Sequence, residues 1–231
     1  MKRIKLILLV ILSLTVNFYS SAQFYSENNG EMIFGYSDIE KAGQSIDSKM
    51  RFTVFLHLGQ NHHYDFNDNI GFFTGYGLRN VGIITDENNI KIKRRTYSLG
   101  IPLALKAGSF RKHFYFYGGG EYELFFHYKQ KQFIDGDKTK QSEWFSDRTK
   151  RFNPSVFGGI QFPGGINLKF KYYLNDFLNR DFSGTDFGVH TDYSVFNKVS
   201  LYYISLSYNF RKGDIKKIYD PSSRTTRLAK L

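Results

Sequence analysis

Two glutamates in this 231-residue chain have the spacing of an acid–base pair. Glu121 and Glu123 lie two positions apart, and on an extended strand they project from one face, about 7 Å from each other. Paired carboxylates at comparable separations perform acid–base chemistry in glycoside hydrolases. The favoured alternative is a charge-balanced network, because cations recur in the same phase of neighbouring segments. The residues predicted to form this network are Arg79, Lys106, Glu121, Glu123, Lys169 and Lys171.

Other chemistry has weaker support in the sequence. His57, His62 and His63 cluster near a turn, but a metal needs three or four convergent ligands, and adjacent extended histidines point to opposite faces. We therefore expect exposed turn histidines and no metal. Gly118–Gly120 lacks the Lys-Ser/Thr that follows a phosphate-binding loop, so no cofactor is predicted. The chain has no cysteine, which excludes disulfides, thiol chemistry and a lipoprotein anchor.

A lipid-modifying enzyme is a second hypothesis for function. Some eight-stranded barrels use a serine, a histidine and an acidic partner near the outer rim. The long polar segments of this chain contain His190 together with Ser142, Ser146, Ser183 and Ser194. No G-x-S-x-G or similar motif surrounds any of these serines, and we therefore expect a protein that is not an enzyme.

The N-terminus predicts export. Lys2, Arg3 and Lys5 precede an apolar run, Leu6–Val16, and small residues at 20–22 precede Gln23. This pattern predicts a secretory signal peptide over 1–22; the alternative, an uncleaved anchor, is disfavoured because the run is too short to span a bilayer as a helix. The net charge of +11 falls to about +8 (11 − 3) without it. Export argues against nucleic acid as the partner of this basic chain.

Period-2 alternation of apolar residues predicts a β fold, as does a content of 18% aromatic residues. Seven segments alternate clearly, and Glu31–Ser37 is a weaker eighth. The clear segments are Arg51–Gln60, Asn69–Arg79, Ile90–Ala107, His113–Lys129, Asn153–Phe162, Ile166–Asn175 and Tyr202–Arg211. An even number lets an antiparallel sheet close without an open edge. We predict an all-β, eight-stranded antiparallel up-and-down transmembrane barrel over 23–211.

The connections between these segments alternate in length. The short ones are Asn61–Asp68, Gly108–Lys112 and Pro163–Gly165, and the longer ones are Asp38–Lys49, Ile84–Asn89, Gln132–Phe152 and Leu178–Lys198. One rim is therefore predicted to carry tight turns and the other long polar loops, as in outer-membrane barrels.

The composition of the two strand faces predicts which one meets lipid. In a soluble lipocalin-like barrel, the remaining alternative, the apolar row would face a ligand cavity. Here the opposite row carries several charges, which an apolar core cannot hold unpaired, together with many glycines. Small residues make room for large polar side chains in a narrow lumen. We predict that Leu99, Ile101 and Leu103 face lipid and the charges face the lumen.

Pro102 falls on the lumenal side and removes a ladder donor, which a β-bulge or a lumenal water would have to compensate. The alternation also assigns His127 to the lumen and Phe126 and Tyr128 to the apolar row.

Several motifs resemble the PorT-like outer-membrane barrels, also called outer membrane β-barrel family 2. Tyr97–Lys106 (YSLGIPLALK) resembles the hallmark strand of that family, and Phe114–Gly120 its aromatic-then-glycine strand. Ala22-Gln23, Gly158-Gly159-Ile160 and Lys171-Tyr172-Tyr173 occupy further matching positions. The resemblance covers roughly 51–210 and implies an outer-membrane barrel; some members resemble a component needed for type IX secretion.

The basic segment after Phe210 departs from the family pattern. Residues 212–231 carry six basic and two acidic side chains and are predicted to form a periplasmic tail, which would dock on a partner or stay solvated. We expect a bacterial outer-membrane barrel with a structural, assembly or secretion-associated role and no general porin activity, because an eight-stranded lumen is narrow. Its expected partners are outer-membrane lipid and a periplasmic or secretion-system protein.

Overall fold

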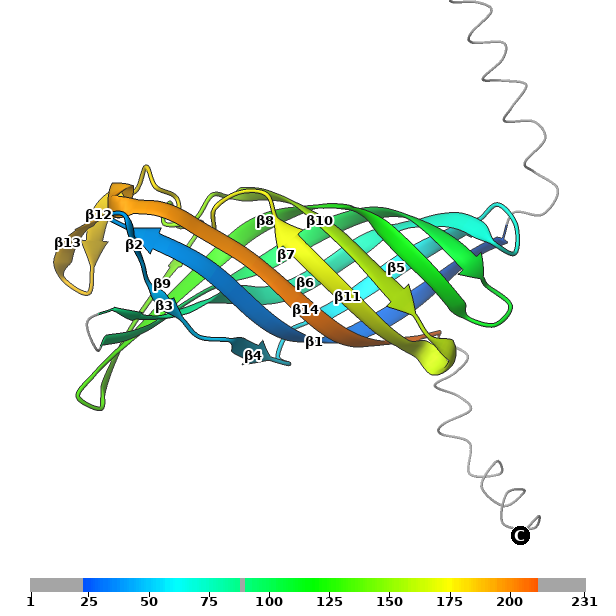
Figure 1. The fold of residues 1–231 in the computed structure, drawn as a ribbon, viewed down its shortest axis with the longest axis horizontal. Helices are drawn as coiled ribbons and strands as arrows, with labels where there is room; N and C mark the ends of the chain where they lie inside the picture. The colour runs from blue at the N-terminus through cyan, green and yellow to red at the C-terminus, as the bar shows by residue number, and fades with distance from the viewer. Residues whose placement is uncertain (1–22, 88–89, 212–231) are drawn as a thin grey trace, which may run out of the picture.

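The computed structural model describes residues 23–87 and 90–211, so the predicted signal peptide and basic tail lie outside the described residues. Eight strands form a closed antiparallel ring (Figure 1). They are β1 (Gln23–Lys41), β5 (Leu58–Asp65), β6 (Ile70–Glu87), β7 (Ile90–Ser109), β8 (Phe114–Ile134), β10 (Phe152–Gln161), β11 (Ile166–Tyr173) and β14 (Phe196–Phe210). Pairing of β14 with β1 closes the ring and confirms the predicted eight-stranded barrel.

The wall of the barrel has an uneven height. Strands β6, β7 and β8 have 18, 20 and 21 residues, whereas β5 and β11 have eight each. The tall side therefore extends beyond the ring at one end. Among the described residues no helix is long and apolar enough to cross a membrane.

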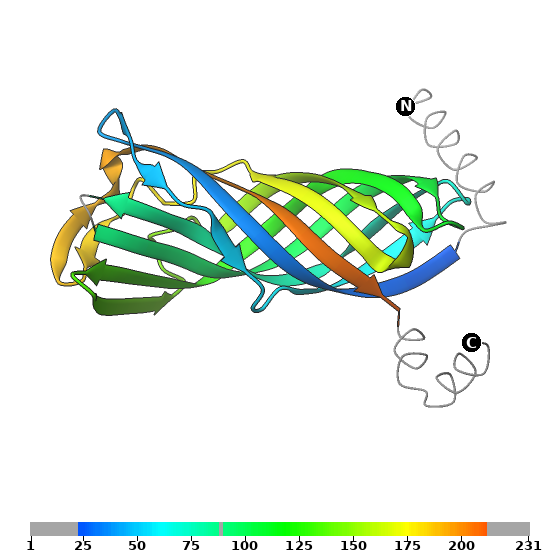
Figure 2. The ribbon, with the colours of Figure 1, turned by 60° about the horizontal axis from the view of Figure 1, so that its bottom comes forward.

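The two rims differ as the connection lengths predict. The turn end carries the tight connections 66–69, 110–113 and 162–165, the last including the short helix η1 (Pro163–Gly165). Strand β4 (Arg51–Thr53) pairs with Ile33–Gly35, about midway along β1. The loop end carries β2 (Gln44–Ser45), β3 (Asp47–Ser48), β9 (Asp137–Trp144), β12 (Ser183–Asp186), β13 (Val189–Asp192) and η2 (Tyr193–Val195). Figures 1 and 2 show these additions at one end of the barrel. The start of β1 and the end of β14 lie at the other end.

The predicted second strand, Arg51–Gln60, is interrupted. Strand β4 ends at Thr53, Leu56 adopts a left-handed backbone with φ of 58°, and β5 begins at Leu58. Both pieces pair with β1, at Gly35↔Arg51 and Gly30↔Leu58. Because the apolar alternation continues through the break, the sequence pattern does not reveal it. Strand β5 then runs through most of the segment predicted as a turn.

Two predicted loops are shorter than expected. Strand β6 continues to Glu87 and β8 to Ile134, where β9 pairs with β8. The polar and basic residues of these extensions resemble loop sequences, and the ladder pairing forms a sheet from them nonetheless. These strand extensions, together with β9, form the tall side of the wall.

The two strand faces lie as predicted over most of the barrel. On β7, Leu99, Ile101, Leu103 and Leu105 point outward and are 45–69% exposed. The inward Ala104 and Lys106 of the same strand are 2% and 1% exposed, and apolar side chains likewise point outward on β8, β10, β11 and β14. The barrel thus carries its apolar surface outside and its charges inside, the reverse of a lipocalin.

A β-bulge overturns the predicted faces at one place. The β7–β8 register shifts so that Tyr97 is opposite His127 and Ser98 is opposite Phe125, which leaves Phe126 unpaired. The extra residue reverses the phase of β8, so that Tyr128 lies inside and His127 outside, stacked on Trp144 at 4.2 Å. The prediction for His127 and Tyr128 was wrong because a bulge leaves no signal in the alternation.

Pro102 interrupts the hydrogen-bond ladder on one side of its strand. The β6–β7 ladder is interrupted between Thr74↔Leu103 and Gly77↔Gly100 without a change of register. The Thr74 Oγ1 hydroxyl donates a 2.8 Å hydrogen bond to the Pro102 carbonyl. This bond satisfies the carbonyl of Pro102 where the ladder is interrupted, and the unchanged register shows that the strand accommodates Pro102 without a bulge between β6 and β7.

Candidate functional site: the charged lumen

Apolar side chains close the lumen at the loop end. Val81, Ile83 and Leu201 point inward from β6 and β14 and pack against Phe177 and Leu178 of the loop that follows β11. Tyr193 of η2 joins this cluster. The middle of the barrel is thereby separated from the loop end by a packed layer.

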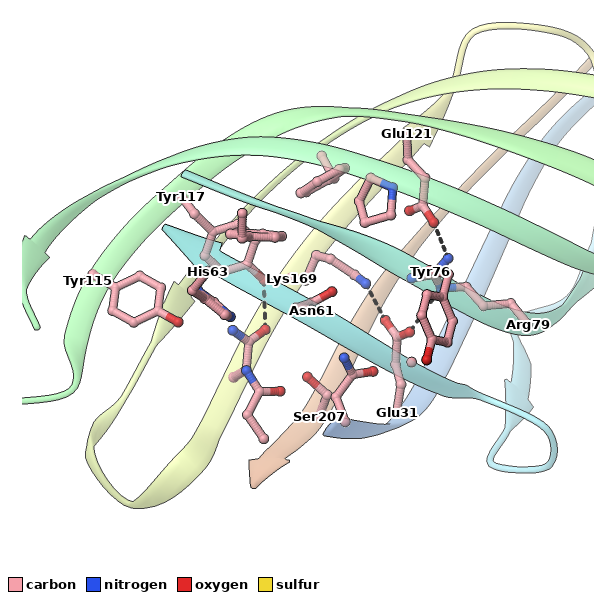
Figure 3. A pocket seen from close by; sticks show the side chains of 17 residues that line it. Glu31, Asn61, His63, Tyr76, Arg79, Tyr115, Tyr117, Glu121, Lys169 and Ser207 are labelled. Carbon is pink, nitrogen blue, oxygen red and sulfur yellow. Dashed lines mark hydrogen bonds and ion pairs between the residues drawn. The ribbon is translucent and has the colours of Figure 1, made fainter. Parts of the chain in front are cut away.

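Six charged side chains meet below this layer. They are Glu31 on β1, Arg79 on β6, Glu121 and Glu123 on β8, and Lys169 and Lys171 on β11. All six occupy inward phases of their strands, and the barrel closure brings together elements that are far apart in sequence. Figure 3 shows Glu31, Arg79, Glu121 and Lys169 pointing toward one another.

The ion pairs of this network link every carboxylate to a cation. Arg79 Nε lies 3.1 Å from Glu31 Oε2, and its Nη1 also pairs with Glu121. Lys169 Nζ lies 2.6 Å from the other oxygen of Glu31. Lys171 Nζ lies 2.7 Å from Glu121 Oε2 and also pairs with Glu123. Three carboxylates and three cations give the cluster a formal charge of zero.

Neutral donors and tight burial complete the network. Ser205 Oγ bonds Glu31 at 2.5 Å, and the Tyr173 hydroxyl donates to Glu123 at 2.9 Å. Lys171 and Glu123 have fully buried side chains. The adjoining cavity has a volume of about 40 Å³, room for a few water molecules only. A carboxylate held by a lysine and a tyrosine is a structural ion pair, and this geometry favours the network over the acid–base pair.

Lys106 belongs to a different cluster. Its Nζ lies 2.5 Å from Asp65 Oδ1 and 2.8 Å from the Tyr25 hydroxyl, and 4.2 Å from the centre of the Phe110 ring near the turn end. The structure therefore brings together five of the six residues predicted for the network. Glu31 completes the network, although it was not predicted to belong to it. The alternation of the weak segment Glu31–Ser37 assigns Glu31 to the inward face, and sequence analysis could have found it from that pattern.

The expectation of exposed turn histidines was wrong, because His62 lies on strand β5, is half-buried and is hydrogen-bonded to Ser26 Oγ at 2.8 Å. His57 and His63 are 2% and 1% exposed, and His63 stacks on Tyr25 at 4.7 Å. Strand β5 replaces the expected turn and carries His63 inward. Among the described residues no group of three potential metal ligands is found.

Glycines on the lumenal face make room for these side chains. A Cβ on Gly100 would lie 2.2 Å from Glu121 Oε1, and one on Gly159 would lie 2.3 Å from the Tyr117 hydroxyl, which bonds Asn167. The outward-facing Gly120 meets only a backbone oxygen, at 3.6 Å. The charged and phenolic side chains therefore occupy the space that a Cβ would take at the lumenal glycines.

An arginine holds the loops together at the loop end. Arg148 donates from Nε to Asp186 at 2.6 Å and from Nη2 to the Thr185 carbonyl at 2.6 Å. Tyr193 donates to the second Asp186 oxygen at 2.8 Å. Burial lowers the pKa of Arg148, but the hydrogen bond and charge of Asp186 outweigh it and raise that pKa above its ordinary value. The β12–β13 hairpin is thus fixed to the chain that follows β9.

Within the described residues, the histidine and the serines proposed for a lipid-modifying enzyme do not form a common site. His190 is exposed on β13, where it is opposite Thr185. Ser146 Oγ instead donates to Glu143 at 2.7 Å, and no described hydrogen bond joins His190 to a serine.

The fold and the lumen together define a small closed β-barrel with an apolar exterior and a filled, charge-balanced interior. No family model and no curated protein matches the chain. Solved structures with the same kind of fold include Neisserial surface protein A, at 13% identity and a TM-score of 0.40, covering 83% of this chain and 99% of that one. OprG of Pseudomonas aeruginosa matches at 14% identity and 0.37, covering 83% and 97%.

Ail of Yersinia pestis, crystallised with a heparin analogue, matches at 15% identity and a TM-score of 0.36, covering 80% of this chain and 99% of that one. At these identities and TM-scores, the similarities identify neither a family nor a function.

Proposed function

We propose that this chain is a bacterial outer-membrane barrel protein with a structural, assembly or secretion-associated role. The observation that carries the membrane location is the outward apolar surface, on which Ile101, Leu103 and Leu105 are each more than 60% exposed. Monomeric soluble proteins rarely expose a continuous apolar surface of this kind, whereas lipid covers it without cost.

Aromatic residues border this surface at both ends. Tyr97, His127 and Trp144 stack in a row toward the loop end. Phe114 contacts Phe116 and Phe162 toward the turn end. Aromatic girdles of this kind lie at the two interfaces of membrane barrels, where amphipathic rings meet the headgroups.

The filled lumen supports a scaffold rather than a general porin. Lys171 and Glu123 lie across the middle of the barrel, and the apolar cluster closes the loop end. An ion crossing this lumen would have to displace paired charges, which costs several kcal/mol. We expect such a protein to act through its loops and its partners rather than as a channel.

Trp144 provides a direct test of the membrane location, because it is the single tryptophan of the chain and is 63% exposed at the aromatic border. When the purified chain folds into phosphatidylcholine vesicles, we expect Trp144 emission to be quenched most strongly by lipids brominated near the headgroup. The measurement is fluorescence across a series of bromination depths.

A matched variant calibrates the depth. Trp144→Phe combined with Ile101→Trp moves the fluorophore to the middle of the apolar surface, and quenching should then be strongest with bromines deep in the chains. Strong quenching by aqueous iodide, with none from brominated lipid at either position, would show that the barrel does not insert.

The secretion-associated role follows from the resemblance to PorT-like barrels and from the place where the described chain ends. Strand β14 ends at Phe210 on the turn end, which faces the periplasm in outer-membrane barrels. The basic segment 212–231 would begin on that side, where a periplasmic partner can bind it.

Affinity capture from membranes tests this role. The full-length chain should retain a periplasmic or secretion-system protein that a chain truncated after Arg211 loses. A control in which the six basic residues of 212–231 become glutamine keeps the length and removes the charge, and it should lose the same partner. Recovery of identical proteins with all three chains would contradict a role for the tail.

A further inference from the structure

Beyond the aromatic border, the outward face of the tall wall carries cations in register. Arg95 is opposite Lys129, and Lys93 is opposite Lys131, which in turn is opposite Lys140 on β9. These five side chains form what we call the basic patch. Three neighbouring strands therefore place positive charges directly beside one another, an arrangement that destabilises a sheet unless a counter-charge is bound.

The described carboxylates do not supply that counter-charge. None of the five residues makes an ion pair within the described ranges; Asp86 pairs with Lys49, and Glu143 pairs with Arg148. The patch cations contact rings instead: Arg95 and Lys129 lie 5.8 and 5.3 Å from the centre of the Tyr97 ring. A surface hollow of about 280 Å³, bordered by Arg95, Lys129, Lys131 and Lys140, lies between them.

The position of the patch along the strands indicates what could fill this hollow. On β7, the outward residues run from Leu99 in the apolar surface through Tyr97 at the aromatic border to Arg95 and then Lys93. Each step of two residues is about 6.6 Å along the strand, and less along the membrane normal because barrel strands tilt. Hydrocarbon, interface and phosphate follow one another in the same order in a lipid leaflet.

We propose that the basic patch binds phosphate groups of lipid headgroups in the leaflet surrounding the loop end. This inference rests on the proposed membrane location and adds a specific lipid contact to it. Lysine and arginine at the right height above the aromatic border attract anionic headgroups. The lipid phosphates provide the negative charge that the sheet extension needs, so the lipid also stabilises β8 and β9.

The test uses the full chain folded in detergent micelles and titrated with lipid A, which carries two phosphates, and with its monophosphoryl form. Binding is read by native mass spectrometry. The triple variant Lys129→Gln, Lys131→Gln and Lys140→Gln should bind lipid A roughly a hundredfold more weakly, since each cation near an anionic surface contributes about fivefold. The unaltered chain should also prefer the bisphosphorylated lipid.

A control triple removes the same charge elsewhere. Arg111→Gln, Lys112→Gln and Lys150→Gln lie outside the patch and should leave lipid A binding within about twofold, a change too small to reflect a lost phosphate contact. Equal loss in both triples would overturn the proposal, because it would show attraction by net charge alone. Tighter binding of a heparin oligosaccharide than of lipid A would also overturn it and assign the patch to a soluble polyanion.

The readouts separate this inference from the membrane location. If Trp144 is quenched by brominated lipid and the patch triple still binds lipid A like the unaltered chain, the barrel inserts and the phosphate site alone is wrong. If neither quenching nor lipid A binding occurs, the membrane location itself fails and this inference fails with it.

Discussion

Replacing Lys171 by methionine should lower the free energy of unfolding by about 3–5 kcal/mol, the usual cost of removing one partner from a buried ion pair. Methionine fills a similar volume, so the loss comes from charge rather than from packing. Lys171 lies between Glu121 and Glu123, and without it three buried carboxylates share Arg79 and Lys169. The measurement is urea unfolding in detergent, with the folded fraction read from the migration of unheated samples in gels.

A second substitution distinguishes lost charge balance from lost contacts. Glu123 relies mainly on Lys171 and on the Tyr173 hydroxyl. The double variant Lys171→Met, Glu123→Gln restores neutrality and should be more stable than Lys171→Met alone. A cost below about 1 kcal/mol for Lys171→Met would contradict a dry, charge-balanced lumen, because only a hydrated site tolerates the loss so easily.

Gly100→Leu should be at least as damaging, with a loss of about 3 kcal/mol or more or a failure to fold. The new Cβ alone would lie 2.2 Å from the Glu121 carboxylate, which is held by Arg79 and Lys171. The leucine therefore overpacks the lumen and separates an ion pair at the same time. The milder Gly100→Ala retains the close approach and should still cost about 1–3 kcal/mol, which keeps the effect measurable.

Gly120→Leu is the matched control for this glycine. Gly120 lies outward on β8, opposite Leu103 and Val156, in the surface proposed to face lipid. A leucine there gains contact with hydrocarbon, and stability should stay within about 0.5 kcal/mol of the unaltered chain. Equal loss in the two leucine variants would show that the two strand faces do not differ in crowding, against the inside–outside assignment.

Local alternation in the sequence was sufficient to predict the strand count, the difference between the rims, and which side of most strands carries charge. It predicted five members of the lumenal network, because Arg79, Glu121 and Lys171 repeat the inward phase of their segments. It could not predict the phase reversal at Phe126, because one extra residue in one strand leaves the composition unchanged. Nor did it reveal the left-handed Leu56 that divides the second segment.

The amino-acid sequence by itself determined the two-faced ribbon, since each strand encodes its own inside and outside through a period of two residues. Only the tertiary structure decided which charges meet. Ring closure places Glu31 of the first strand beside Lys169 of the seventh strand of the ring, whereas Lys106 lies near the turn end with Asp65. The physical reason is that pairing depends on the register between strands. Register is a property of the closed sheet and not of any one segment.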